Sequence, residues 1–331
     1  MQVFLTGADG FIGSHLTETL VSRGVSVRAF VQYNSANSWG WLDHFANQTP
    51  QNLEIVSGDI QDPHAVKSAM VGCTHVAHLA ALVAIPYSYM APTSYINTNV
   101  KGTLNVLQAA LDIGIERFVH TSTSEVYGSA QYVPMDEAHP LVGQSPYSAS
   151  KIAADQMVNA FNSSFGLPTL ILRPFNTFGP RQSARAVIPT VITQIAFGDG
   201  NVKLGALHPT RDFTYISDTV EGFCKALACS DVIGETINLG TKSEIVIKQI
   251  VHSVAKIMGK EVNIVTDDQR KRPEKSEVDR LLSDNSKAKD LIGWSPLYTD
   301  LDGFERGLEQ TIDWFVNQNK MVDYKVNNYN V

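Results

Sequence analysis

Three residues of this 331-residue chain have the types and spacing that proton transfer requires. Tyr147 and Lys151 are four positions apart, so on a helix their side chains share one face. A lysine ammonium one turn away lowers the pKa of a phenol, and the phenol can then take a proton from a sugar hydroxyl. Thr123, expected at the end of a strand, could hydrogen-bond the same hydroxyl. Together they predict oxidation of an alcohol, with a nicotinamide as hydride acceptor.

A glycine-rich loop near the N-terminus is the candidate binding site for such a cofactor. Gly7, Gly10 and Gly13 follow a short β-type run, residues 2–6, and open a predicted helix over 14–23. The glycines allow a tight turn and close approach to a pyrophosphate, while the helix N-terminus offers free N–H groups. At the first turn of an alternating α/β chain, this pattern favours dinucleotide binding over a purely structural turn.

The end of the second predicted strand, residues 25–31, bears on the choice between NAD and NADP. An acid there would accept from the ribose hydroxyls, and an arginine would accommodate a 2′-phosphate. Gln32, Tyr33 and Asn34 supply neither, so the choice stays open. We expect NAD, because no basic residue is present at this point to bind the 2′-phosphate of NADP. Asp59, after the third strand, could accept from the adenine amine or could cap a turn.

Strand and helix patterns alternate through the first half of the chain. This alternation predicts an α/β fold with a Rossmann-type, doubly wound parallel sheet and a smaller C-terminal α/β substrate lobe. We expect the cofactor domain at 1–174, with a return of the chain to it near 212–240, the substrate lobe mainly at 175–321, and a tail at 322–331. Further strands are expected at 53–57, 75–80, 117–122, 169–173, 202–205, 236–239 and 262–265, and helices at 62–71, 94–113, 147–164, 187–197, 217–229, 246–258 and 303–318.

Composition excludes several classes of protein. The net charge of −7 disfavours nucleic-acid binding, and no apolar run is long enough to span a bilayer. Three unpaired cysteines and the absence of a signal-peptide pattern indicate a reduced, cytoplasmic setting. His75 and His78 point to opposite faces of a β-type segment, so we predict no metal site.

The motifs together resemble the extended short-chain dehydrogenase/reductase family, over residues 2 to about 318. The resemblance rests on the glycine loop, Gly58-Asp59, His78-Leu-Ala-Ala81, Asn99-Val-Lys-Gly-Thr103, Tyr147 with Lys151, and Arg173-Pro-Phe-Asn176. It implies that a nucleotide-sugar binds beneath the C-terminal lobe. The cofactor residues it implies are Gly7, Asp9, Gly10, Phe11, Ile12, Gly13, Gln32, Tyr33, Asn34, Asp59, Ile60, Leu79, Ala80, Ala81, Asn99, Thr121, Tyr147, Lys151 and Phe175.

The segment from Ser122 to Gly128 is similar to the active-site strand of nucleotide-sugar 4,6-dehydratases. In such a reaction, oxidation at C4 acidifies the C5 proton, a carboxylate removes it, and water leaves from C6. Glu125 is the candidate base. Many dTDP-glucose dehydratases carry aspartate where this chain has Ser124, which is too weak an acid to replace it alone. Either Glu125 serves both steps, or Ser124 relays a proton through water.

Two features resemble particular subgroups of dehydratases. The loop from Tyr33 to Leu42 is similar to that of legionaminic-acid-pathway (LegB-type) enzymes, which act on nucleotide-linked N-acetylglucosamine. Arg272-Pro with Ser276-Glu-Val-Asp279 resembles the GDP-sugar enzymes, with two extra residues between the two motifs. A GDP- or UDP-N-acetylglucosamine substrate is therefore expected.

Residues for the substrate are expected after the sixth strand and in the lobe. Guanidinium groups match phosphate geometry, and Arg211 resembles the family's diphosphate arginine. The other candidates are Asn176, Arg181, Arg185 and Arg272 for the diphosphate, Val187 and Leu204 beside the nucleobase, and Val83 near the sugar.

Three alternative functions stay open. A 4-epimerase on the same scaffold needs no Glu125, and a 5,6-dehydratase would stop after elimination. A non-catalytic cofactor-binding regulator would commonly lack Tyr147 or Lys151. Helices 94–113 and 147–164 each have an apolar outer stripe, although single buried helices show similar stripes. The resemblance implies that these helices pair across a two-fold axis as a four-helix bundle, so a homodimer is expected.

Overall fold

A parallel sheet of seven strands forms the centre of the computed structural model, which describes residues 1–46, 48 and 50–317. Its strands are buried apolar runs, as in Val3, Phe4 and Leu5, which are fully inaccessible to solvent. The strand order is β10-β6-β5-β4-β1-β2-β3, and every pairing is parallel. The doubly wound fold is confirmed. The bounds are β1 (Gln2–Thr6), β2 (Ser26–Gln32), β3 (Leu53–Gly58), β4 (His75–His78), β5 (Arg117–Thr121), β6 (Thr169–Pro174) and β10 (Glu235–Leu239).

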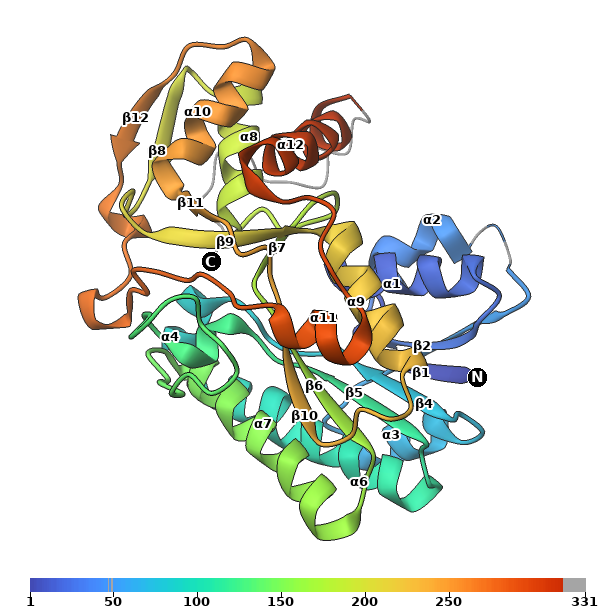
Figure 1. Cartoon of the computed structure of the whole chain (residues 1–331). Coiled ribbons are helices and arrows are strands. Elements are labelled where there is room, and N and C mark those ends of the chain that lie inside the picture. Colours follow the sequence, from blue (N-terminus) through green and yellow to red (C-terminus); the bar gives the residue numbers. More distant parts are fainter. Residues whose placement is uncertain (47, 49, 318–331) are drawn as a thin grey trace.

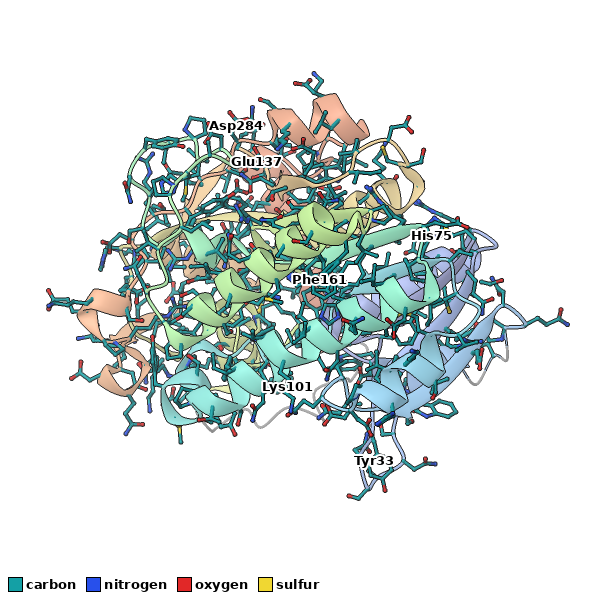
Figure 2. All side chains as sticks on the ribbon, turned by 90° about the horizontal axis from the view of Figure 1, so that it is seen from below. Tyr33, His75, Lys101, Glu137, Phe161 and Asp284 are labelled. Carbon is teal, nitrogen blue, oxygen red and sulfur yellow. The ribbon has the colours of Figure 1, made fainter. Side chains whose placement is uncertain are left out.

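Helices cover both faces of this sheet (Figure 1). On one face α1 (Phe11–Ser22) packs against α9 (Ile216–Ala228), with Leu16 and Phe223 in one buried cluster. On the other face α3 (Pro63–Met70), α6 (Thr103–Ile113) and α7 (Pro146–Phe165) enclose a second cluster. Helices α6 and α7 lie side by side across this face (Figure 2).

The helix expected over 94–113 is divided into three segments. Pro92–Tyr95 forms α5, Ile96–Gly102 forms a wider π-helical segment, and α6 follows. In the π segment the Asn99 amide donates to the Leu82 carbonyl oxygen at 2.9 Å and to the Ser150 hydroxyl at 2.9 Å. The widened turn therefore coincides with a side chain that ties this segment to the loop after β4 and to α7.

Smaller sheets and helices build the C-terminal part of the chain. One mixed sheet contains β7 (Asn176–Phe178), β9 (Thr210–Tyr215) and β11 (Glu244–Val246), and β8 (Asn201–Leu204) pairs in parallel with β12 (Asn263–Thr266). After β9 and before β11, the chain returns to the large sheet as β10. The two regions therefore interleave in sequence. The remaining helices are α2 (Asp43–Ala46), α4 (Ile85–Met90), α8 (Val187–Phe197), α10 (Ile247–Met258), α11 (Ser286–Ile292) and α12 (Asp300–Val316).

Two expectations fall on the edge of what the structure describes. The tail at 322–331 lies outside the described residues, as does the end of the helix expected over 303–318. Within residues 1–46, 48 and 50–317, no helix is both long and apolar enough to cross a membrane. The division into a cofactor domain and a substrate lobe stays a prediction.

Candidate active site

The proton-transfer residues meet where β5 ends and α7 begins. Thr123 caps the short 3-10 turn Ser124–Tyr127, and its hydroxyl accepts from the Glu125 N–H at 3.2 Å. Tyr147 lies in the first turn of α7 and hydrogen-bonds the Thr123 side chain. The helix starts there because a capping box joins Ser145 and Ser148 around Pro146. The structure thus brings Thr123 and Tyr147 into contact.

Burial dominates the ionisation of Tyr147 and Lys151. It raises the pKa of Tyr147, against the lowering effect of the Thr123 hydrogen bond, and lowers the pKa of Lys151 to about 8. The expectation that lysine lowers the phenol pKa is not met in the chain alone. The Lys151 ammonium instead donates to the Thr121 carbonyl oxygen at 2.7 Å and lies 3.5 Å from His120 Nε2.

A buried ionic network lies behind Lys151. Asp155, one turn further along α7, accepts from Arg173 Nη2 at 3.0 Å and from the Ser122 hydroxyl at 2.8 Å. Burial alone would raise the pKa of Asp155, but the His120 hydrogen bond and the Arg173 charge hold it below its usual value. Burial also lowers the pKa of His120 to about 4, so the imidazole is neutral at pH 7. Sequence reasoning missed His120 and Asp155, although Asp155 has the same four-residue spacing from Lys151.

Glu125 lies in a chain of opposite charges rather than alone. Its carboxylate is 12% exposed and 3.7 Å from Arg272 Nη1. Arg272 is in turn 3.8 Å from Glu277, which also pairs with Arg211 at 3.3 Å. The structure therefore joins the candidate base to two of the predicted substrate residues. Glu277 was quoted in a motif but not proposed as a site residue. Ser124, the other predicted catalytic residue, is 2% exposed.

The glycine loop has the close approaches that a dinucleotide cradle needs. Gly7 has φ +70°, and a Cβ there would lie 2.8 Å from the Ala80 backbone nitrogen. At Gly13 a Cβ would lie 2.0 Å from the Gly7 carbonyl oxygen. Gly10 caps α1 without a side-chain hydrogen bond, so the first-turn N–H groups are free for an anion. Phe11 and Ile12 begin that helix. These residues fit a dinucleotide pyrophosphate.

The predicted nucleoside side of the cradle lies at the ends of β2 and β3. The Asp9 carboxylate accepts from the Gln32 N–H at 3.4 Å, and burial raises the pKa of Asp9. Asn34 folds back onto its own loop, since its amide donates to the Ser38 carbonyl oxygen at 2.7 Å. Asp59 is exposed and accepts from the Gln61 N–H at 2.8 Å, which is a turn contact. Tyr33 is also exposed, and Ile60 is buried beneath Gly102.

The predicted nicotinamide side lies after β4, β5 and β6. The N–H groups of Leu79 and Ala80 each donate to the Thr6 hydroxyl at 3.2 Å, which fixes the backbone that leads to Ala81. Asn99 holds the next residue, Leu82, as described above. Phe175 is 3% exposed and packs in a cluster with Val126 and Tyr127. In the chain alone Phe175 is therefore a core side chain.

Two predicted diphosphate residues have unmet hydrogen-bonding capacity. Asn176, at the start of β7, has a buried side-chain oxygen without a partner. Arg272 Nη1 is likewise buried without a hydrogen bond. Such groups are costly unless a ligand or water satisfies them. Arg211 is 5% exposed and donates to the Thr210 carbonyl oxygen at 2.9 Å.

The other two arginines have local partners. Arg181 pairs with Glu18 of α1 at 2.9 Å and donates to the Ser14 hydroxyl at 3.1 Å. Arg185 is exposed and contacts the Ser183 hydroxyl at 3.1 Å. The geometry therefore supports a diphosphate-binding role less well for Arg181 and Arg185 than for Arg211. Of the apolar candidates, Val83 is exposed, Val187 is half-buried and Leu204 is buried in the first core cluster.

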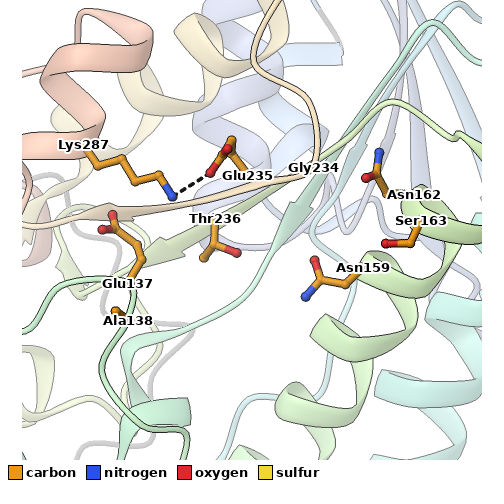
Figure 3. A pocket seen from close by; sticks show the side chains of 9 residues that line it. All are labelled: Glu137, Ala138, Asn159, Asn162, Ser163, Gly234, Glu235, Thr236 and Lys287. Atoms are coloured by element: carbon orange, nitrogen blue, oxygen red, sulfur yellow. Dashed lines mark ion pairs between the residues drawn. The ribbon is translucent and has the colours of Figure 1, made fainter.

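A cavity of about 410 Å³ lies at the other end of α7 (Figure 3). It is lined by polar side chains, with Lys287 and Glu235 paired at 2.7 Å on one side and Asn159 and Asn162 across from them. Asn162 lies fifteen residues after Tyr147, which is about 22 Å along a helix. This cavity is separate from the candidate active site. Among the described residues, no cluster of three or more metal-ligating side chains occurs.

Comparison with known proteins decides the family. The family model described as GDP-mannose 4,6 dehydratase matches residues 4–310. The chain belongs to the extended short-chain dehydrogenase/reductase family of nucleotide-sugar epimerases and dehydratases. A dTDP-glucose 4,6-dehydratase from Xanthomonas campestris pv. campestris is 34% identical over 337 residues, covering 94% of this chain and 92% of that protein.

Solved structures of this epimerase/dehydratase family include both activities. The dTDP-glucose 4,6-dehydratase DesIV from Streptomyces venezuelae, solved with NAD, superposes with a TM-score of 0.86 at 28% identity, over 98% of this chain and 99% of that one. A UDP-N-acetylglucosamine 4-epimerase from Methanobrevibacter ruminantium gives a TM-score of 0.85 at 28% identity, over 96% of this chain and 98% of that one. The fold is thus shared by dehydratases and epimerases, and only the site can distinguish them.

Proposed function

We propose that this chain is an NAD-dependent nucleotide-sugar 4,6-dehydratase. One observation carries the proposal: Glu125 lies in the same 3-10 turn that Thr123 caps, its N–H donates to the Thr123 hydroxyl at 3.2 Å, and its carboxylate is only 12% exposed. A C4 oxidation that reverses at C4 needs Thr123, Tyr147 and Lys151 alone. An elimination needs a further base near C5, and Glu125 is the carboxyl group that the active-site turn provides.

The chain's residues would act in sequence. Tyr147 takes the proton of the C4 hydroxyl, which Thr123 orients, and Lys151 stabilises the phenolate. NAD, when bound at the loop of Gly7, Gly10 and Gly13, would supply the hydride chemistry that oxidation at C4 and reduction at C6 require. Glu125 removes the C5 proton, whose acidity the neighbouring C4 ketone raises. The product is a 4-keto-6-deoxy sugar, and the C6 oxygen leaves as water.

The departing C6 hydroxyl needs a proton. Ser124 is buried and cannot supply one alone. We propose that Glu125, once protonated by C5, transfers that proton to the C6 oxygen, either directly or through a Ser124-bound water. A second proton must then reach C5 when hydride returns to C6. The 12% exposure of Glu125 supports proton exchange with solvent at this step.

The substrate class is also a proposal. Buried Arg211 and half-buried Arg272, whose Nη1 has no hydrogen-bond partner, support a diphosphate, since guanidinium groups match phosphate geometry. The Tyr33–Leu42 loop, similar to that of LegB-type enzymes, favours GDP- or UDP-N-acetylglucosamine. We further propose NAD over NADP, because Gln32, Tyr33 and Asn34 supply no cation for a 2′-phosphate. A homodimer and a cytoplasmic setting stay predictions.

Mass spectrometry tests the proposal. The purified protein is incubated with NAD and, separately, with GDP- and UDP-N-acetylglucosamine. Loss of one water from either supports a dehydratase and names the nucleotide. Unchanged mass with a shifted retention time would instead support a 4-epimerase, the activity of the Methanobrevibacter relative. Proton NMR of a dehydrated product distinguishes a 4-keto-6-deoxy sugar from an olefin.

A further inference from the structure

Four side chains of alternating charge form a line through the predicted diphosphate site. They are Arg211, Glu277, Arg272 and Glu125, with side-chain exposures of 6, 16, 25 and 12% respectively. One carboxylate oxygen, Glu277 Oε1, lies 3.3 Å from Arg211 Nη2 and 3.8 Å from Arg272 Nη1. A single glutamate oxygen therefore faces both guanidinium groups.

The backbone around Glu277 is firmly held. Its carbonyl oxygen accepts from the Gln144 amide at 3.1 Å and from the Ser129 hydroxyl at 3.5 Å. Its N–H donates to the Pro273 carbonyl oxygen at 3.1 Å. The carboxylate is attached through a flexible side chain, and its Oε1 accepts a hydrogen bond from the Val278 backbone N–H at 3.3 Å. A rotation of that side chain could withdraw the carboxylate and leave the backbone in place.

The two arginines are held to Glu277 by incomplete contacts. Arg272 Nη1 is buried but makes no hydrogen bond, because both of its carboxylate neighbours are 3.7 Å or more away. Arg211 also donates from Nη1 to the Thr210 carbonyl oxygen at 2.9 Å, a bond that does not involve Glu277. A ligand with more oxygens and more charge would satisfy both guanidinium groups better than one carboxylate oxygen does.

We propose that Glu277 is an internal counter-anion that a nucleoside diphosphate displaces from Arg211 and Arg272. In the free chain it balances the buried Arg211 and the partly buried Arg272, whose charges would otherwise be costly. On binding, the diphosphate takes over both guanidinium groups and the glutamate side chain rotates away. This inference rests on the proposed nucleotide-sugar function. Glu277 is a positioning residue that sets the affinity of the site and reserves it for ligands with two adjacent phosphates.

Substitution of Glu277 by glutamine tests this role. The amide oxygen can still accept from Arg211, so the side-chain shape is kept while the charge is removed. Binding of UDP, GDP and dTDP to NAD-saturated protein is measured by titration calorimetry. We expect Glu277→Gln to bind at least one nucleotide roughly five- to thirtyfold more tightly than the unaltered chain does. A merely structural role would weaken binding instead.

Two further variants complete the test. Glu277→Asp keeps the charge on a shorter side chain. Its affinity for the nucleotide should therefore lie between those of the unaltered chain and Glu277→Gln. Glu221 lies on α9 and forms an exposed ion pair with Arg23, which follows α1. Glu221→Gln removes the same charge there and should bind nucleotides as the unaltered chain does. Thermal unfolding checks folding: Glu277→Gln should unfold at lower temperature without ligand and gain more from the nucleotide.

The outcomes are separable. Tighter binding by Glu277→Gln, with no change in Glu221→Gln, supports displacement. Equal or weaker binding by a folded Glu277→Gln overturns it and leaves the proposed function intact. If neither the unaltered chain nor any variant binds a nucleoside diphosphate, the proposed substrate class fails and the inference fails with it.

Discussion

At the scale of single residues, burial decides the chemistry of the site more than charge partners do. Tyr147, Lys151 and His120 all have pKa values moved first by loss of water, and each is moved toward its neutral form. The spacing of Tyr147 and Lys151 could be predicted from the sequence, because helical periodicity is local. The direction of the Tyr147 shift could not, since it depends on what surrounds the phenol.

Replacement of Glu125 by glutamine tests the proposed base. The amide cannot accept the C5 proton, so water loss should fall roughly a hundred- to ten-thousandfold. Affinity for NAD, measured by fluorescence quenching, should not change. The Glu221→Gln variant is the matched control for loss of one carboxylate. Formation of the 4-keto-6-deoxy product by Glu125→Gln at a near-normal rate would exclude Glu125 as the base.

The lowered pKa of Lys151 predicts a pH-dependent stability. Its pKa is about 8 in the folded chain against an ordinary 10.5, so between these values the unfolded chain holds a proton that the folded chain has lost. Stability from this group therefore rises with pH across that window. The free energy of unfolding is measured in urea titrations without cofactor. For the unaltered chain, taken relative to that of Lys151→Met, it should rise by roughly 2 kcal/mol from pH 8 to 10. A constant difference would contradict the shift.

At the scale of elements, local pattern predicts strands well and pairing poorly. Strands β1 to β6 are apolar runs, and their positions follow from that pattern alone. The edge position of β10 and the line from Arg211 to Glu277 join segments far apart in sequence, so no local spacing signals them. The π-helical segment around Asn99 also depends on contacts outside itself, with Leu82 and Ser150.

Two glycine substitutions separate backbone conformation from close approach. Gly7 and Gly24 both have positive φ, at +70° and +78°, and an alanine in either costs about 1–2 kcal/mol of stability. Only Gly7 faces another backbone within 3 Å, whereas a Cβ at Gly24 meets open space. We expect Gly7→Ala to weaken NAD binding at least roughly tenfold. Gly24→Ala should bind normally, and equal loss in both would assign the effect to stability.

At the scale of the whole molecule, the face formed by α6 and α7 is the best candidate for assembly. The two helices run side by side over the sheet (Figure 2). Several of their outer positions are small or apolar, including Leu104, Ala149 and Ala153, beside the polar Gln108 and Gln156. Leu104 is 37% exposed. A two-fold axis through this face would pair two helices from each protomer, as a four-helix layer. Since Tyr147 lies in the first turn of α7, assembly would also brace this proposed catalytic residue.

Sedimentation velocity measures this assembly directly. The unaltered chain should sediment as a dimer, and Leu104→Arg should sediment as a monomer, because a guanidinium buried without an anion opposes association. Leu297→Arg is the matched control, since Leu297 is 77% exposed and lies next to α9, on the opposite side of the sheet. If helix bracing matters, the Leu104→Arg monomer should also lose activity while keeping its fold. A Leu104→Arg chain that stays dimeric would move the interface away from α6 and α7.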